Sequence, residues 1–235
     1  MRANFCLPPM RSIATVCLMS ACLTASAAPT HAEIAWEVNR NGSAIAEAVD
    51  SFDQDGKTYH ISSTWKGRGL LRLAGDVRRA SRGTIVASGL RPQEFEDARS
   101  GRDTERASFN WISNTLTWQY KGPAQSGPIP ANVCDRLTQV YGFVLRAPES
   151  GPFQVNVVDG RGIHAYTYKV GGREALKTPA GEFETIRLVK VKDGPEDRAT
   201  EIWLAVKQHH LPVRVLVVEK DGTRTDQVAT RVSLR

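Results

Sequence analysis

The chain has 235 residues, of which 41% are hydrophobic and 24% are charged. These are ordinary values for a globular protein with a packed core. The formal net charge is +6 at pH 7, but basic and acidic residues are interspersed, and the sequence has no basic run of the kind that binds nucleic acid. The length suits one large all-β domain or two small ones, and we expect no nucleic-acid partner.

The N-terminal segment predicts export. Arg2 and Arg11 precede an apolar stretch (residues 13–27), small residues follow, and no acidic residue interrupts them. This is the order of a secretory signal peptide, and the apolar run is shorter than the ~20 residues that a membrane span needs. We therefore predict a signal peptide over residues 1–32 and a single periplasmic, β-barrel-like domain over residues 33–235.

A lipoprotein signal is the alternative interpretation of this segment. Ser20 and Ala21 precede Cys22 as in a lipoprotein box, although Met19 stands where Leu, Val or Ile is usual. In that case residues 1–21 would be removed, and an acylated Cys22 would tether the domain to a membrane. Ordinary cleavage is the favoured interpretation.

Cysteine usage indicates that stability comes from packing. After ordinary cleavage only Cys134 remains, and one cysteine cannot form an intramolecular disulfide even in an oxidising compartment. No neighbouring residue marks Cys134 as a thiolate, so we predict a small buried apolar residue.

Most of the chain reads as strands. Apolar and polar residues alternate with period two, which indicates strands with one buried face, and turn sequences such as DQDG (53–56) separate them. We interpret GLLRLAG (69–75) and RGTIVASGL (82–90) as two of roughly thirteen strands, and the polar stretch 91–105 as a surface loop.

One segment predicts a helix. Apolar residues from Val133 to Val144 recur at intervals of three and four, and Asn132 can cap the start. No helices alternate with the strands, which argues against a parallel βαβ fold. We therefore predict a mostly all-β protein: a strongly curved antiparallel sheet or an open or closed β-barrel. One helix, near residues 133–145, should lie against its mouth or concave face.

The candidate chemical motifs do not assemble into a catalytic or metal site. His209 and His210 are adjacent between two predicted strands, so they point to opposite faces, and we predict a turn. DQDG lacks the flanking ligands of a calcium loop. Carboxylates close in sequence (Glu94, Glu96, Asp97) are interpreted as a solvated loop. We predict no metal site, no cofactor and no catalytic residues.

The aromatic residues suggest a ligand site instead. All five tryptophans lie in predicted strands, and side chains inside a curved sheet can either fill a core or line a cavity. The candidate ligand-binding residues are Trp65, Phe109, Trp111, Trp118 and Trp203. The pattern leaves open whether the interior is filled, because both interpretations point these side chains inward.

Ordered short motifs resemble an exported bacterial family, domain of unknown function 3108. They are STWKGRGL, SRGTIVASGLRPQEF, FNW, DRLTQVY, DGRG, TPAGEFETIRL, EIWLA, LPVRV and EKDG. Asn110 stands where Asp is expected in FDW, which weakens the idea of a catalytic acid there. The resemblance covers nearly all of the mature chain and implies export and fold rather than an activity.

The C-terminal passage GEFETIRL to LPVRVLVVEKDG also resembles periplasmic lipoprotein-carrier proteins, half-barrels whose concave apolar face holds acyl chains. The leading hypothesis is therefore a non-enzymatic envelope protein that binds an apolar or amphipathic molecule, such as a lipid. One alternative is a structural or interaction protein with a filled barrel and an envelope protein partner. Another is an enzyme acting on cell-envelope polysaccharide or peptide. Contact with a membrane is expected only if Cys22 is lipidated.

Overall fold

The computed structural model describes residues 28–195 and 197–235, so Cys22 and most of the predicted leader lie outside the described residues. The described residues form one 15-stranded sheet with short helical segments. The strands are β1 (His31–Arg40), β2 (Ser43–Gln54), β3 (Thr58–Gly67), β4 (Val77–Val86), β5 (Gly89–Arg99), β6 (Glu105–Asn110), β7 (Thr115–Gln119), β8 (Gln125–Pro128), β9 (Val133–Asp135), β10 (Pro152–Asp159), β11 (Gly162–Thr178), β12 (Gly181–Lys190), β13 (Ala199–Ala205), β14 (Leu211–Val218) and β15 (Arg224–Leu234). The helical segments are η1 (Gly69–Ala74), α1 (Thr138–Tyr141), η2 (Gly142–Val144) and η3 (Val206–Gln208).

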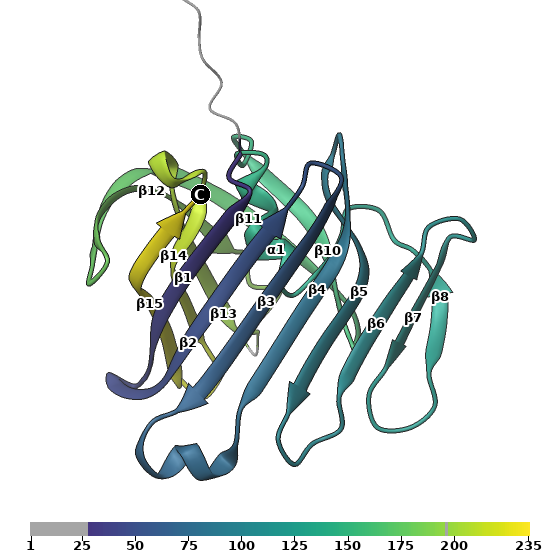
Figure 1. Cartoon of the computed structure of the whole chain (residues 1–235), viewed down its shortest axis with the longest axis horizontal. Helices are drawn as coiled ribbons and strands as arrows, with labels where there is room; N and C mark the ends of the chain where they lie inside the picture. Colours follow the sequence, from purple (N-terminus) through teal and green to yellow (C-terminus); the bar gives the residue numbers. More distant parts are fainter. Residues whose placement is uncertain (1–27, 196) are drawn as a thin grey trace, which may run out of the picture.

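The sheet is antiparallel and strongly curved, as predicted (Figure 1). Its strand order is β8-β7-β6-β5-β4-β3-β2-β1-β15-β14-β13-β12-β11-β10-β9, so the first and last strands of the chain pair with each other at its centre. The pairing of β9 with β10 is parallel. β8 and β9 are the two edges, so the sheet is not closed into a barrel by backbone hydrogen bonds.

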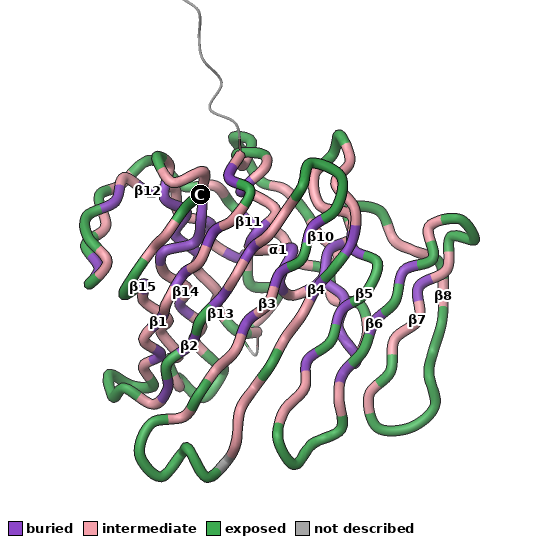
Figure 2. Tube along the Cα trace, in the orientation of Figure 1, coloured by how far each residue is buried: buried purple, intermediate pink, exposed green. Residues whose placement is uncertain are grey.

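The strands follow from the period-two pattern. Along β1, Ala32, Ile34, Trp36 and Val38 are buried, and each is followed by a more exposed residue. Asn41 and Gly42 then adopt positive φ angles of 49° and 84°, the backbone that a tight hairpin turn requires. Figure 2 shows buried positions within the strands and exposed positions in the turns. β1 begins at His31, so its first two residues fall inside the segment predicted as the leader.

Three sequence interpretations were wrong. RGTIVASGL (82–90) is not one strand, because Ala87 and Ser88 form the turn between β4 and β5. The stretch 91–105 is not a loop: most of it belongs to β5, whose inward positions carry Phe95 and the buried carboxylate of Asp97. GLLRLAG is not a strand but the 3-10 helix η1. Its flanking glycines, Gly69 and Gly75, have positive φ angles of 56° and 77°, which break an extended backbone.

The predicted helical segment is shorter than its apolar spacing suggests. Its first three residues form β9, which pairs with β10 from Asn156 to Val158. The side chain of Asp135 then accepts the backbone N–H groups of Leu137 and Thr138, both at 2.8 Å, so the helix starts only after this turn.

The helical segment lies on the concave face of the sheet. The ring of Tyr141 stacks on Phe52 of β2 with a centroid separation of 6.5 Å. Val140 packs against both apolar clusters, a large one that includes β1, β2 and β3 and a smaller one formed by β10–β14. The short helix therefore joins the two halves of the curved sheet, as predicted for a helix on the concave face.

The histidine pair forms a turn, as predicted. His209 and His210 follow η3 and have positive φ angles of 51° and 55°. The His210 amide donates to the carbonyl of Ala205 at 2.9 Å. β14 begins at the next residue, Leu211.

Candidate binding cavity

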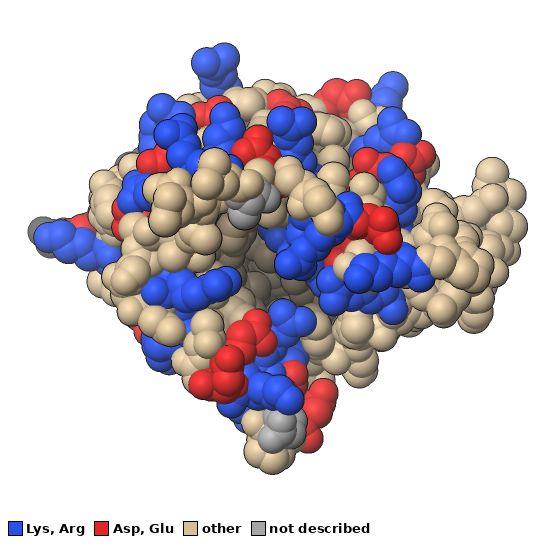
Figure 3. All heavy atoms as spheres, turned by 90° about the horizontal axis from the view of Figure 1, so that it is seen from below, with Lys and Arg blue, Asp and Glu red and all other residues tan. Residues whose placement is uncertain are grey.

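A cavity of 380 Å³ opens on the concave face of the sheet. Its walls come from β1–β5 on one side and from β10, β11 and β13–β15 on the other, together with α1. Figure 3 shows the hollow from the end at which it opens, with basic side chains around it. The volume lies within the range of small-molecule pockets, about 300–1,000 Å³.

The interior is divided into a packed half and an open half. On β2 and β3, Phe52 and Ile61 are fully buried in the apolar core. Nearer the other end of the same strands, Asp50, Ser63 and Trp65 line the cavity. The interior is therefore filled by side chains at one end of the sheet and open at the other.

One part of the cavity wall is aromatic and aliphatic. These residues come from β1 and β3, from α1 and the residue before it, and from β11, β13 and β14: Trp36, Trp65, Leu137, Val140, Tyr141, Tyr166, Tyr168, Ile202, Val215 and Val217. Such a surface favours burial of an apolar or ring-shaped part of a ligand, at about 25 cal/mol per Å² of apolar area.

The other part of the wall presents arginines over buried acids. Asp97 has a fully buried side chain and contacts three guanidinium groups: Arg79 at 2.9 Å, Arg99 at 2.8 Å and Arg136 at 3.5 Å. The arginine side chains are 17–27% exposed. A ligand entering the cavity therefore meets the guanidinium groups and not the carboxylate beneath them.

This network continues toward β6 and β10. Arg136 also pairs with Asp159 of β10 and lies 3.8 Å from Glu105 of β6, and Arg161 contacts Glu105 at 2.8 Å. His164 Nε2 lies 3.6 Å from Asp159. The side chains of Glu105 and Asp159 are almost fully buried, so their charges rely on these partners.

Two acids of this network, Asp97 and Asp159, have lowered pKa values. Burial by itself raises the pKa of Asp97, but hydrogen bonds and charges from Arg99 and Arg79 outweigh it and lower the pKa below its ordinary value. For Asp159, burial again raises the pKa, but His164 and Arg136 outweigh this effect. The pKa of Asp159 is therefore well below its ordinary value. The arginines thus face stable negative charges on their inner side.

Asp50 is a carboxyl group of the opposite kind. Its Oδ2 accepts hydrogen bonds from Trp36 Nε1 at 3.0 Å and from the Tyr141 hydroxyl at 2.6 Å. Burial raises the pKa of Asp50 above its ordinary value even though the charge of Arg79 and the hydrogen bonds from Tyr141 and Trp36 oppose it. Asp50 therefore has a greater tendency to carry a proton than Asp97 or Asp159.

Two lining residues present unpaired oxygens. Among the described residues, neither Asp50 Oδ1 nor Gln139 Oε1 has a hydrogen-bond partner, although both atoms are buried. Both side chains line the cavity. Because buried polar atoms are normally hydrogen-bonded, these oxygens are candidate contacts for hydroxyl or amide groups of a ligand.

The structure does not gather the five predicted aromatic residues at one site. Trp65 lines the cavity, with Arg79 stacked over its ring at 5.1 Å. Trp203 is the neighbour of the cavity residue Ile202 along β13, so it faces the opposite side of the sheet. There it lies near Arg187 and Arg214, at 6.0 and 4.7 Å from its ring.

The other three predicted residues lie in the β6–β7 region. Phe109 is buried in the apolar core and stacks on Trp111 at 6.2 Å. The indole N–H of Trp111 donates to the Pro92 carbonyl at 2.7 Å. Trp118 lines a separate surface hollow formed by β5, β6 and β7. The position of aromatic residues in predicted strands therefore did not identify the residues that line the cavity.

The charged residues of the site were missed by sequence reasoning. Arg79 and Asp97 are direct register partners on β4 and β5, so reading 91–105 as a strand would have paired them. Arg136 and Asp159 are 23 residues apart and share no local pattern. Only the fold brings them together.

No further chemical centre stands out in the described part of the chain. Within residues 28–195 and 197–235, no group of three or more His, Cys, Asp or Glu residues is arranged to hold a metal ion. In the same residues, no helix is long and apolar enough to cross a membrane. Cys134 is buried, as predicted, and burial raises the pKa of its thiol well above the ordinary value.

Over residues 32–228, the chain matches the family described as "Protein of unknown function (DUF3108)". The chain belongs to this family. A comparison with curated proteins found no match.

Among solved structures, the fold is similar to "Beta-barrel-like Protein of Domain of Unknown Function DUF1849 from Brucella abortus", with a TM-score of 0.57 and 8% identity over 89% of this chain and 99% of the other. A structure titled "a putative lipoprotein from Parabacteroides distasonis ATCC 8503" matches with a TM-score of 0.39 and 10% identity, over 88% of this chain and 96% of the other. The first of these supports a beta-barrel-like fold.

Proposed function

We propose that this protein is a non-enzymatic, exported binding protein of the bacterial envelope. Its ligand has an apolar or ring-shaped part and an anionic group. The observation that carries the proposal is the cavity itself, in which an aromatic wall faces Arg79, Arg99 and Arg136, three arginines that share the buried carboxylate of Asp97 behind them. Planar guanidinium groups suit carboxylate and phosphate, which they bind with paired hydrogen bonds.

The polar oxygens extend the description of the ligand. Asp50 and Gln139 offer unpaired buried oxygens in the same cavity, so a ligand with hydroxyl or amide groups near its anionic end would satisfy them. The N-terminal signal pattern supports a periplasmic location. Envelope amphiphiles with acidic head groups combine these features.

The first experiment is native mass spectrometry of the protein exported in a bacterial host and purified without detergent. We expect a reproducible extra mass that is lost on delipidation. The stripped protein is then titrated with dodecyl phosphate and with dodecanol, which share a chain and differ in charge. We expect the phosphate to bind at least about tenfold more tightly, since charge-assisted hydrogen bonds to arginine are the stronger kind.

Variants locate the binding. Trp65→Ala should weaken dodecyl phosphate binding by about tenfold, and Arg198→Gln should weaken it less, because Arg198 is 46% exposed at the cavity. Trp111→Ala is the matched control, since Trp111 lies outside this cavity. A clean apo mass together with equal, weak binding of both probes would contradict the proposal and favour the interaction-protein alternative.

The enzyme alternative keeps one supporting observation. Asp50, with a raised pKa, and His164 line the same cavity, and acid–base catalysis uses such groups. Cleavage of peptidoglycan fragments by the wild type that disappears in Asp50→Asn would establish this activity and contradict the non-enzymatic proposal.

A further inference from the structure

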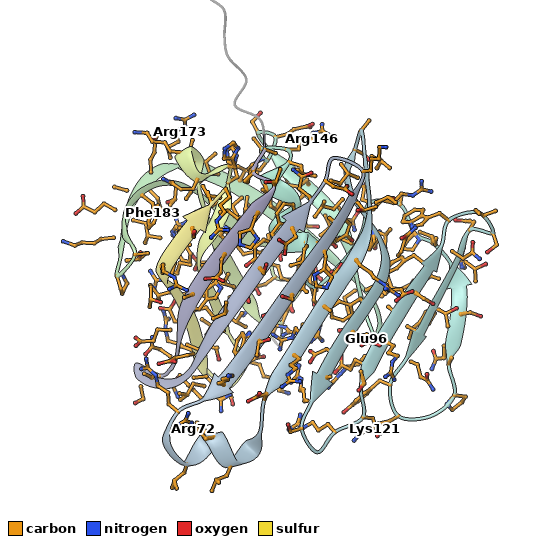
Figure 4. The ribbon with its side chains drawn as sticks, viewed as in Figure 1. Arg72, Glu96, Lys121, Arg146, Arg173 and Phe183 are labelled. Atoms are coloured by element: carbon orange, nitrogen blue, oxygen red, sulfur yellow. The ribbon has the colours of Figure 1, made fainter. Side chains whose placement is uncertain are left out.

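Three leucines are exposed in η1, the segment between β3 and β4. Leu70, Leu71 and Leu73 are 86%, 48% and 87% exposed. Scattered single apolar residues on a surface need no explanation, but adjacent ones mark contact sites. The η1 segment projects beyond the strand ends in Figure 1, and Figure 4 labels Arg72 on this segment, on the side nearer the strands.

The η1 segment is held in place by specific backbone contacts. The Arg68 amide donates to the Ile45 carbonyl at 2.8 Å. A Cβ atom on Gly67 would lie 2.4 Å from the Leu71 carbonyl oxygen, so this close approach requires glycine. The exposure of the leucines is therefore a consequence of a formed structure.

Basic residues surround the leucines. Residues 66–79 contain five basic residues and one acidic residue, Asp76. Glu37 and Glu47 hold the guanidinium of Arg68, and Arg78 lies 3.5 Å from Asp76 while its side chain stays 72% exposed. Arg68, Arg78 and Arg79 thus have acidic partners. Among the described residues, the positive charge of this segment without such a partner comes from the exposed Lys66 and Arg72. Exposed leucines beside such cations are a pattern that binds an anionic lipid surface.

The η1 segment lies at the same end of the sheet as the cavity opening. Trp65 lies four residues before η1 and Arg79 five residues after it, and both line the cavity. A surface that contacts the leucines would therefore face the opening of the cavity.

We infer that η1 docks the protein on an anionic phospholipid surface, with the leucines inserted among the head groups and the basic residues near lipid phosphates. This docking rests on the exposed loop alone and goes beyond the proposed cavity ligand. A second copy of the chain is the less suitable occupant, because a stable interface buries about 800 Å² per partner and η1 is a narrow tip of six residues.

The test is vesicle flotation with the exported, detergent-free protein. The vesicles contain either phosphatidylethanolamine with phosphatidylglycerol or phosphatidylcholine alone. We expect the wild type to float with the anionic vesicles and to be released by high salt. Leu70→Ser/Leu73→Ser should lower the partition coefficient about tenfold or more, and Arg72→Glu should lower it severalfold on anionic vesicles only.

Ile112→Ser is the matched control, because Ile112 is 101% exposed in the β6–β7 turn, at the other end of the sheet. It should float like the wild type. Thermal unfolding should be unchanged in all these surface variants. The inference is overturned if the wild type does not float, if the leucine variant floats equally, or if the leucine changes instead dissociate a dimer in solution. Cavity binding of dodecyl phosphate should be retained in the leucine variant, so the two proposals fail separately.

Discussion

The two halves of the curved sheet are joined at its centre by a backbone ladder and at its open side by buried charges. At the centre, β1 pairs with β15 from Ala32–Leu234 to Arg40–Thr225, with one bulge. At the open side, β9 and β10 face β4–β6, and among the described residues no ladder pairs them. The contacts there are the hydrogen bond between Ser81 and Asp135 at 2.6 Å and the ion pairs of Arg136 and Arg161.

We call this second contact the ionic seam: Ser81, Asp97, Glu105, Asp135, Arg136, Asp159 and Arg161. A ladder uses backbone groups that every residue except proline supplies, so it tolerates changes of side chain. The ionic seam depends on particular charges in a buried place, where an unpaired partner is costly. The ladder and the ionic seam should therefore respond very differently to mutation and to pH.

The largest difference is expected from Arg136→Met. This change removes the guanidinium that pairs with Asp159. The same guanidinium also lies near Asp97 and Glu105, so both of these acids lose a nearby positive charge. Loss of one partner of a buried ion pair costs about 3–5 kcal/mol, which urea unfolding would measure. Arg231→Met is the control on the ladder side, where the exposed pair with Glu33 should contribute no more than about 1 kcal/mol. Equal effects would show that the ionic seam is no more critical than the ladder.

A second prediction concerns the close approach of the two sides. A Cβ atom on Gly160 would lie 2.6 Å from the Gln119 carbonyl oxygen and from Glu105 Cα. Gly160→Ala should therefore destabilise the protein by about 1–3 kcal/mol through forced backbone shifts. Gly172→Ala, where the added Cβ meets no atom within 4 Å, should change the free energy of unfolding by less than about 0.5 kcal/mol. If Gly160→Ala leaves the free energy of unfolding unchanged, the ionic seam is loosely packed at this position.

Acid should open the ionic seam before the ladder. The folded-state pKa values of Asp97 and Asp159 are lowered, so their stabilisation is complete above the ordinary pKa of 3.8 and is lost as pH falls below it toward the folded values. Hydrogen exchange compared at pH 5 and pH 3 should show protection falling first in β9 and β10, while β1 and β15 stay protected. Loss of protection in β1 first would contradict this order.

Asp50 should give the smallest and opposite effect. Its folded-state pKa is raised, so the folded protein binds more protons than the unfolded chain above pH 3.8, and stability falls as pH rises toward the folded value. Asp50→Asn keeps an oxygen to accept from Trp36 and Tyr141 and removes the titration. The variant should gain stability relative to the wild type between pH 4 and pH 7. A constant difference across this range would show that Asp50 does not titrate there.

The sequence by itself determined the all-β class, the antiparallel sheet, most of the strands and several of the turns. Alternation along β1 and the Asn41-Gly42 turn are local, because each residue's face follows from its position along an extended chain. The turn at His209 and His210 followed for the same reason. Where charged residues filled the inward positions, as in β5, the same rule was harder to apply, because Asp97 does not look like a core residue.

The tertiary structure decided the cavity. Asp97 is buried beside Arg99 of its own strand, Arg79 of the neighbouring strand and Arg136 from a distant part of the chain. Trp65 and Trp203 are both strand tryptophans in the sequence, yet the folded sheet turns one toward the cavity and the other away. The sequence around the exposed leucines of η1 likewise resembled a strand. In the structure, the positive φ angles of Gly69 and Gly75 interrupt the extended backbone there. Hydrophobic periodicity encodes which face a residue takes, whereas pairing between distant charges depends on how the whole sheet curves.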